Sequence, residues 1–111
     1  MKIPADAAIP TEKLTRYLLV RRPWDDKSRF LARAGFMQGN PDELLADLRR
    51  HAARFEAVPD GQNEYGEFFR VDGELPGPSG VELCVATIWM RWNKDGSWHF
   101  ITLKPAREKR S

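Results

Sequence analysis

The chain has 111 residues, which suits a single domain with one hydrophobic core. Hydrophobic residues make up 41% of it and charged residues 31%, a composition that excludes a largely disordered chain. No apolar run approaches the roughly 20 residues that span a bilayer, the first ten residues lack the apolar stretch of a signal peptide, and Cys84 is the only cysteine. We therefore expect a protein of the reducing cytoplasm with no membrane contact and no disulfide.

The formal net charge of +2 conceals an uneven distribution. Residues 56–82 hold one Lys or Arg against seven Asp or Glu, whereas the segments on both sides are basic. A basic surface can steer a polyanion such as RNA towards a protein. The same pattern is also typical of a mixed, solvated surface that only keeps a domain soluble.

Residues 1–10 are expected to be an irregular lead-in, and two helices should follow. Thr11 is a suitable N-cap for the first, which ends before Pro23 because a residue preceding proline avoids the helical conformation. The second begins at Asp25 or Asp26, where a carboxylate complements the helix dipole, and Gly35 follows its end in a left-handed conformation. Its buried stripe comprises Phe30, Leu31 and Ala34.

The third expected helix has the clearest local signature. Asn40 is its cap, Pro41 takes the first helical position and Glu43 occupies the capping-box position. The apolar face is formed by Leu44, Leu45, Leu48 and Ala52, and the C-terminal end carries Arg49, Arg50 and Arg54.

Strands follow the helices. Phe55–Val58 is a candidate short strand, 59–64 a polar loop, Tyr65–Gly73 a strand, and Leu75–Gly80 a turn rich in Pro and Gly. The order therefore predicts an α+β fold in which two or three N-terminal helices pack on one face of a three- to four-stranded antiparallel sheet. We expect one domain over residues 11–105 and a basic tail over 106–111.

The strongest signal is a β-hairpin around Asn93–Gly96, because apolar runs rich in Val, Ile, Thr and Trp flank an Asp-Gly. If this loop is right, Trp92 pairs with Ser97, and the register follows. One face would then be core, formed by Ala86, Ile88, Met90, His99, Ile101 and Leu103. The other would mix hydroxyls, rings and cations in the pairs Val85–Lys104, Thr87–Thr102, Trp89–Phe100 and Arg91–Trp98. A three-residue loop would slip the register by one and scramble these pairs, because side chains alternate along a strand.

Few residues carry chemistry. His51, His99 and Cys84 show no ligand spacing, and no phosphate loop or dinucleotide fingerprint occurs, so we expect neither a metal site nor a cofactor. We place His51 at the surface of a basic helix end. Cys84 and His99 both fall on the expected core face several residues apart, which disfavours a Cys-His nucleophile.

The mixed face of the hairpin is the candidate binding surface. There, Thr87, Trp89 and Arg91 would bind RNA, since rings stack on bases and cations hold phosphates. The alternative is structural, because Thr–Thr and aromatic cross-strand pairs also stabilise sheets. The residues leave both interpretations open.

Several short motifs stand in a fixed order between about Lys13 and Pro105, namely Lys13–Leu19, Lys27–Phe36, Tyr65-Gly66, Val71–Gly80, Val85–Trp89 and Phe100–Pro105. In that order they resemble a bacterial family described only as a domain of unknown function. The resemblance implies either a free-standing protein encoded beside a small partner or a C-terminal module of a large adhesin-like or toxin protein. The helices-then-strands layout is also similar to the metal-independent ribonuclease toxins of the barnase, EndoU, colicin and RelE group, an analogy at the level of fold.

Two functions follow from the resemblance. In the first, a ribonuclease-like toxin of a toxin–antitoxin or polymorphic-toxin system, Lys27 and Arg29 hold the phosphate, Tyr65 and Thr102 lie near the scissile group, and Trp89 stacks on a base. This ribonuclease site lacks a general base, because the expected register places His99 on the other face.

The second function is a non-enzymatic domain that binds a small partner or antitoxin protein. If a helix covers the sheet face of Thr87, Trp89 and Thr102, the ribonuclease site has no place in the fold. If that face is an open groove lined by Lys27 and Arg29, the ribonuclease is favoured.

Overall fold

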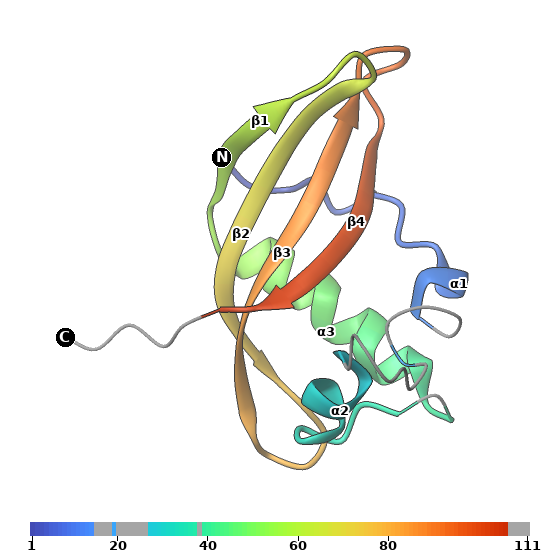
Figure 1. The fold of residues 1–111 in the computed structure, drawn as a ribbon, viewed down its shortest axis with the longest axis vertical. Coiled ribbons are helices and arrows are strands. Elements are labelled where there is room, and N and C mark those ends of the chain that lie inside the picture. The colour runs from blue at the N-terminus through green and yellow to red at the C-terminus, as the bar shows by residue number, and fades with distance from the viewer. Residues whose placement is uncertain (15–18, 20–26, 38, 107–111) are drawn as a thin grey trace, which may run out of the picture.

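The computed structural model of the protein describes residues 1–14, 19, 27–37 and 39–106. Within them, helices precede strands in the order α1 (Thr11–Lys13), α2 (Lys27–Ala32), α3 (Pro41–Arg54), β1 (Ala57–Gln62), β2 (Gly66–Pro76), β3 (Glu82–Trp92) and β4 (Trp98–Pro105). The strands form one antiparallel sheet in the order β1-β2-β3-β4, and they pass in front of α3 in Figure 1. The predicted α+β class, with helices before strands, is confirmed.

The first expected helix is described only at its start, because 15–18 and 20–26 lie outside the described residues, as do the starts proposed at Asp25 and Asp26. α1 begins at Thr11 itself, so Pro10 and not Thr11 takes the N-cap position. After α2, Gly35 adopts a φ of +92°, and the N–H of Phe36 donates to the carbonyl of Leu31 at 3.2 Å. This is the predicted glycine end of a helix, where the absent Cβ removes the cost of a left-handed conformation.

The long helix α3 matches its predicted start, with Pro41 in the first turn and Asn40 at the N-cap position. The Asn40 side chain, however, makes no capping bond. Its Oδ1 accepts the N–H of Met37 at 2.8 Å, and its Nδ2 donates to the carbonyl of Gly35 at 3.4 Å. The side chain therefore stabilises the α2–α3 loop, whereas the sequence assigned it to the helix.

The hairpin loop is as predicted, but the register changes within the strands. The N–H of Trp92 donates to the carbonyl of Ser97 at 2.9 Å, and the predicted pairs of Trp89, Met90 and Arg91 are confirmed. A β-bulge between Ile88 and Trp89 then leaves Ile101 unpaired, so Ile88 pairs with Thr102 and Thr87 with Leu103. The predicted pairs Ile88–Ile101, Ala86–Leu103, Thr87–Thr102 and Val85–Lys104 are wrong, because a bulge inserts one extra residue into one strand.

The assignment of the two faces is wrong in part: Ala86, Ile88, Met90 and Leu103 are buried as predicted, but the face predicted to be mixed is buried as well. α3 packs on the face that carries Thr87, Trp89 and Phe100, which are at most 1% exposed. We call this the covered face; its residues are Phe69, Val71 and Leu75 on β2, Leu83, Val85, Thr87 and Trp89 on β3, and Phe100 and Leu103 on β4. The opposite face, which was predicted to be core, we call the open face.

His51 was predicted at the surface and is instead 2% exposed. Its Nε2 lies 3.0 Å from Oγ1 of Thr87 and 3.2 Å from the carbonyl oxygen of Val71, and the Trp89 indole N–H donates to the same Thr87 oxygen at 2.9 Å. Burial lowers the pKa of His51 below its ordinary value of 6.5, against hydrogen bonds that favour the charged ring. The imidazole therefore joins α3 to the middle of the sheet.

The expected lead-in of residues 1–10, which we call the N-terminal strap, contributes to the core. Ile3, Ala7 and Ile9 are buried in the same cluster as α3 and the covered face. The strap passes behind the strands in Figure 1, on the side of α3. Within the described part of the chain, no helix is both long and apolar enough to cross a bilayer.

Candidate functional site on the open face

No described helix lies on the open face, which faces the viewer in Figure 1. Side chains alternate along each strand, so the residues between those of the covered face point here. They are Phe68, Arg70, Asp72 and Glu74 on β2, Cys84, Ala86, Ile88, Met90 and Trp92 on β3, and His99, Thr102 and Lys104 on β4. The bulge sets the face on which Thr102 and Lys104 lie, because the extra residue returns them to the side of His99.

A chain of hydrogen bonds orients His99. The Ser97 hydroxyl donates to Oδ1 of Asp95 at 2.6 Å, and Nε2 of His99 lies 2.9 Å from the same hydroxyl oxygen. The hydrogen bonds from Ser97 hold the pKa of the Asp95 carboxyl below its usual range, which keeps Asp95 an acceptor. Since the Ser97 proton points to Asp95, the Ser97 oxygen accepts the Nε2–H of His99, and Nδ1 carries the lone pair of the neutral ring.

Aromatic rings line the loop end of this face. Trp92 stands edge-on to His99, with ring centroids 5.5 Å apart, and tilts against Tyr65 at 6.4 Å. The Tyr65 side chain is 58% exposed, and the Tyr65 carbonyl accepts the N–H of Asn93 at 2.9 Å. The end of β3 thus places the Trp92 ring against the half-buried His99, and the β1–β2 loop places the Tyr65 ring against Trp92.

Two cations lie further along the same face. Arg70, Ile88 and Thr102 are neighbours in one cross-strand row, and Asp72, Ala86 and Lys104 form the next. The Arg70 guanidinium is held by Asp72, with Nε at 3.0 and 3.1 Å from the two carboxylate oxygens. His99, Thr102, Arg70 and Lys104 therefore follow one another across the open face.

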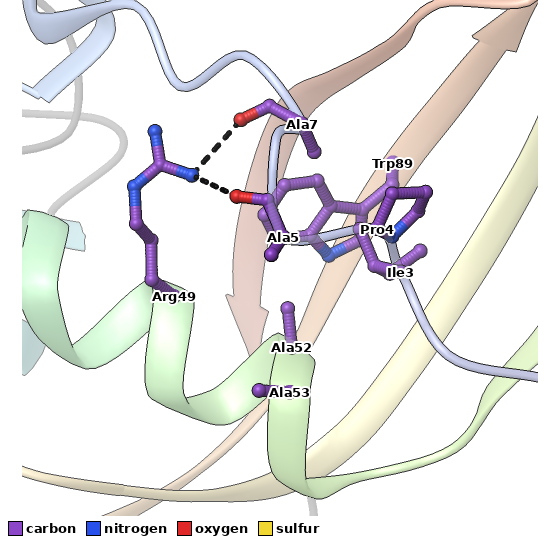
Figure 2. Close-up of a pocket in the computed structure, with 8 residues that line it drawn as sticks. All are labelled: Ile3, Pro4, Ala5, Ala7, Arg49, Ala52, Ala53 and Trp89. Carbon is purple, nitrogen blue, oxygen red and sulfur yellow. Dashed lines mark hydrogen bonds between the residues drawn. The ribbon is translucent and has the colours of Figure 1, made fainter.

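The N-terminal strap fixes the backbone that carries His99. The N–H of Ala8 donates to the carbonyl of Trp98, and the N–H of Phe100 donates to the carbonyl of Ala8, both at 2.8 Å. On α3, Nη1 of Arg49 donates to the carbonyls of Ala5 and Ala7 at 3.1 Å, beside a cavity of about 140 Å³ lined in part by Trp89 (Figure 2). Arg49 thereby ties the strap, and through it the outer edge of β4, to α3.

The residues predicted to bind RNA are separated by the fold. Thr87 and Trp89 are buried against α3 and the strap, so they contact no solvent. Arg91 is exposed, with Nη2 3.7 Å from the Glu67 carboxylate, and pairs with Trp98. The condition set by the sequence is met for Thr87 and Trp89: their face is covered, and a ribonuclease site has no place on it.

The four predicted catalytic residues divide between two ends of the sheet. α2 carries Arg29, which is exposed, and begins at Lys27, whose side chain lies outside the described part of the structure. α2 lies by the β2–β3 turn, since Ser79 bonds to Ala34 and Arg33. Tyr65 lies at the opposite end, beside the β3–β4 loop (Figure 1). The structure brings Tyr65 and Thr102 to the side of His99, and it does not bring Lys27 and Arg29 there.

From the sequence, neither Arg70 nor the Asp95–Ser97 pair was singled out, whereas Lys104 was expected among the cations of the mixed face and His99 on the opposite face. The available signal was the Asp95-x-Ser97 spacing in the loop before β4, because an Asp side chain commonly accepts the backbone N–H two residues on. Among the described residues, no three His, Cys, Asp or Glu side chains come together as a metal ion would need.

The fold defines a class, a small α+β domain whose helices precede a four-stranded antiparallel meander, with one sheet face that no described helix covers. The chain belongs to the family described as a domain of unknown function, DUF6883, whose model matches residues 4–107. The predicted membership in a family of unknown function is confirmed, and the placement at the ends of adhesin-like proteins stays a prediction.

No curated protein matches the chain. Among solved structures, a chain of a contact-dependent growth inhibition toxin–immunity protein complex from Klebsiella pneumoniae 342 is similar, with a TM-score of 0.67 and 21% sequence identity. The match covers 94% of this chain and 97% of that chain. At this identity the likeness shows a shared fold over nearly the whole length of both chains.

Proposed function

We propose that the protein is a toxin that cleaves RNA without a metal ion, with His99 as its general base. The observation that carries this proposal is the Asp95–Ser97–His99 chain on a face that no described helix covers. The similarity to a chain of a toxin–immunity complex supports a role in growth inhibition.

Nδ1 of His99 takes the proton of a ribose 2′-hydroxyl, and the 2′ oxygen attacks the adjacent phosphorus. The bond from phosphorus to the 5′ oxygen breaks, giving a 2′,3′-cyclic phosphate and a free 5′-hydroxyl. Tyr65, at the same end of the sheet, is the proposed donor of the proton that the 5′ oxygen takes up. Arg70 and the Thr102 hydroxyl, neighbours across Ile88, stabilise the charge that develops on phosphate oxygens.

A second function is favoured by the covered face. Because Thr87 and Trp89 are buried, the sheet lacks the RNA surface that the sequence suggested, which favours a non-enzymatic domain that binds a small partner protein. The solved complex is consistent with this function as well, since it contains an immunity protein beside a toxin.

Inducible expression in a bacterial host, with growth followed over time, separates the two functions. We expect growth arrest with the wild type, and relief by His99→Gln and by Thr102→Val but not by the exposed-loop control Lys94→Gln. Purified protein should then cleave RNA in the presence of a chelator and leave cyclic phosphate ends. Lys27→Ala and Arg29→Ala test the phosphate-binding roles that the sequence suggested.

Normal growth at high soluble expression, together with intact RNA after incubation with pure protein, would contradict the toxin. The binding domain would then become the main hypothesis.

A further inference from the structure

The open face is hollowed at the end away from the Asn93–Gly96 loop. The pocket has a volume of about 780 Å³, within the range of sites that hold small organic molecules. Its walls come from β2, β3, the end of β4, and Phe55 at the end of α3. Gly73 lets the Phe55 ring approach, because a Cβ there would overlap that ring.

Two of the four charged side chains that line the pocket form an ion pair with each other, and the other two do not. Arg70 and Asp72 pair with each other, with Nη2 3.0 Å from Oδ1. Glu74 and Lys104 form no ion pair with a described residue and lie on opposite sides of the pocket, on β2 and β4, with small Cys84 and Ala86 on β3 between them. A ligand with an anion at one end and N–H donors at the other satisfies both groups.

The pocket is continuous with the proposed cleavage site. Arg70 lines it and also stands in the cross-strand row of Thr102, and the row of His99 comes next. Alternate residues of a strand are about 6.8 Å apart, so the pocket lies some two to three rows from His99. This distance exceeds the reach of the nucleotide next to the cleaved bond and suits a base a few nucleotides away in the same RNA strand.

The carboxylate of Glu74 selects among the bases by their donors. Guanine presents two adjacent N–H donors, at N1 and N2, which match the two oxygens of a carboxylate. Adenine and cytosine place one donor beside an acceptor, and uracil places one donor between two acceptors. An acceptor-only carboxylate therefore favours guanine over the other three.

We propose that this pocket binds a guanine nucleotide of the RNA strand, a few nucleotides from the cleaved bond. Glu74 accepts the N1–H and N2–H of the base, and Lys104 binds the phosphate. The inference rests on the proposed ribonuclease function for its biological role, whereas the binding itself requires no catalysis.

The test is titration of the full chain with guanosine 5′-monophosphate, uridine 5′-monophosphate and inorganic phosphate, followed by amide chemical shifts. We expect the guanine nucleotide to bind about tenfold more tightly than the uracil nucleotide, with shifts at Glu74, Cys84 and Lys104. Glu74→Gln should remove this preference and leave uridine 5′-monophosphate binding unchanged. Lys104→Gln should weaken both nucleotides equally, and the exposed carboxylate control Glu82→Gln should change neither.

Equal binding of the two nucleotides, an unchanged preference in Glu74→Gln, or shifts that inorganic phosphate alone reproduces would overturn the guanine pocket. If guanine selectivity is found but wild-type protein leaves RNA intact, the ribonuclease proposal fails and the nucleotide site stands. The two failures are therefore distinguishable.

Discussion

Each face of the sheet carries one of the two histidines of the chain, and the two histidines differ in burial and in hydrogen-bond partners. On the covered face, His51 is 2% exposed, its pKa is lowered by burial, and it contacts Thr87 and two backbone carbonyls. On the open face, His99 is half-buried, and the Ser97 hydroxyl, which itself donates to Asp95, contacts one of its ring nitrogens. A buried imidazole with polar contacts to both nitrogens holds elements together, whereas an imidazole with one nitrogen uncommitted among described residues can move a proton.

The comparison is tested most strongly by His99→Gln. We expect RNA cleavage to fall by about 100- to 10,000-fold, the usual contribution of a general base. The free energy of unfolding should change by less than about 1 kcal/mol, because the side chain is only half-buried. Initial rates on a labelled oligoribonucleotide and urea melts measure the two quantities. A large stability loss with unchanged cleavage would assign His99 to structure.

The second comparison uses two tryptophans. Trp89 is 1% exposed beneath α3 and the strap, so we expect Trp89→Ala to lower the free energy of unfolding by about 3–5 kcal/mol. Trp92→Ala, on the open face and half-buried, should cost about 1–2 kcal/mol. Urea denaturation of both variants gives the difference, and equal losses would show that the two faces contribute alike.

A third comparison uses two threonines and keeps the side-chain volume. Thr87→Val removes the acceptor of the Trp89 indole and a partner of His51, so we expect a loss of about 1–3 kcal/mol. Thr102→Val lies on a half-exposed row of the open face and should cost about 0.5 kcal/mol or less. Thermal and urea melts test both, and a costly Thr102→Val would contradict a role for Thr102 that is confined to the site.

The smallest expected effect concerns pH. Because burial lowers the folded-state pKa of His51 below 6.5, the unfolded state binds more protons as the pH falls below 6.5. The contribution of neutral His51 to stability is complete above pH 6.5. It is lost as the pH falls from 6.5 to the lowered pKa of folded His51, with a slope of at most about 1.4 kcal/mol per pH unit. Urea melts between pH 7.5 and 5.5 should show a steeper decline for the wild type than for His51→Gln. Parallel declines would assign the pH dependence to other groups.

Local chemistry predicted much of this fold. The turn at Asn93–Gly96, the proline at the start of α3 and the glycine after α2 each follow from a preference of one or two residues, and each is confirmed. The family resemblance is confirmed over nearly the whole chain.

The faces of the sheet could not be predicted in the same way. Both faces of β3 are largely apolar, so alternation does not say which one α3 will cover. The bulge has no local signal either, because Ile101 is a β-branched residue that suits regular strand. These two events together moved Thr102 to the side of His99 and buried Thr87 and Trp89. Candidate sites built on strand alternation alone therefore change when one residue is left unpaired.

The N-terminal strap has a consequence for the order of folding. Ala8 is bonded to the carbonyl of Trp98 and the N–H of Phe100, so the beginning of the chain meets its last strand. Contacts between residues so far apart in sequence close a long loop and form slowly compared with helices and hairpins. During synthesis β4 emerges after the other strands of this domain, and the backbone around His99 gains its second partner only then. The edge of the sheet beside His99 is therefore fixed only when residues 1–10 and β4 have met.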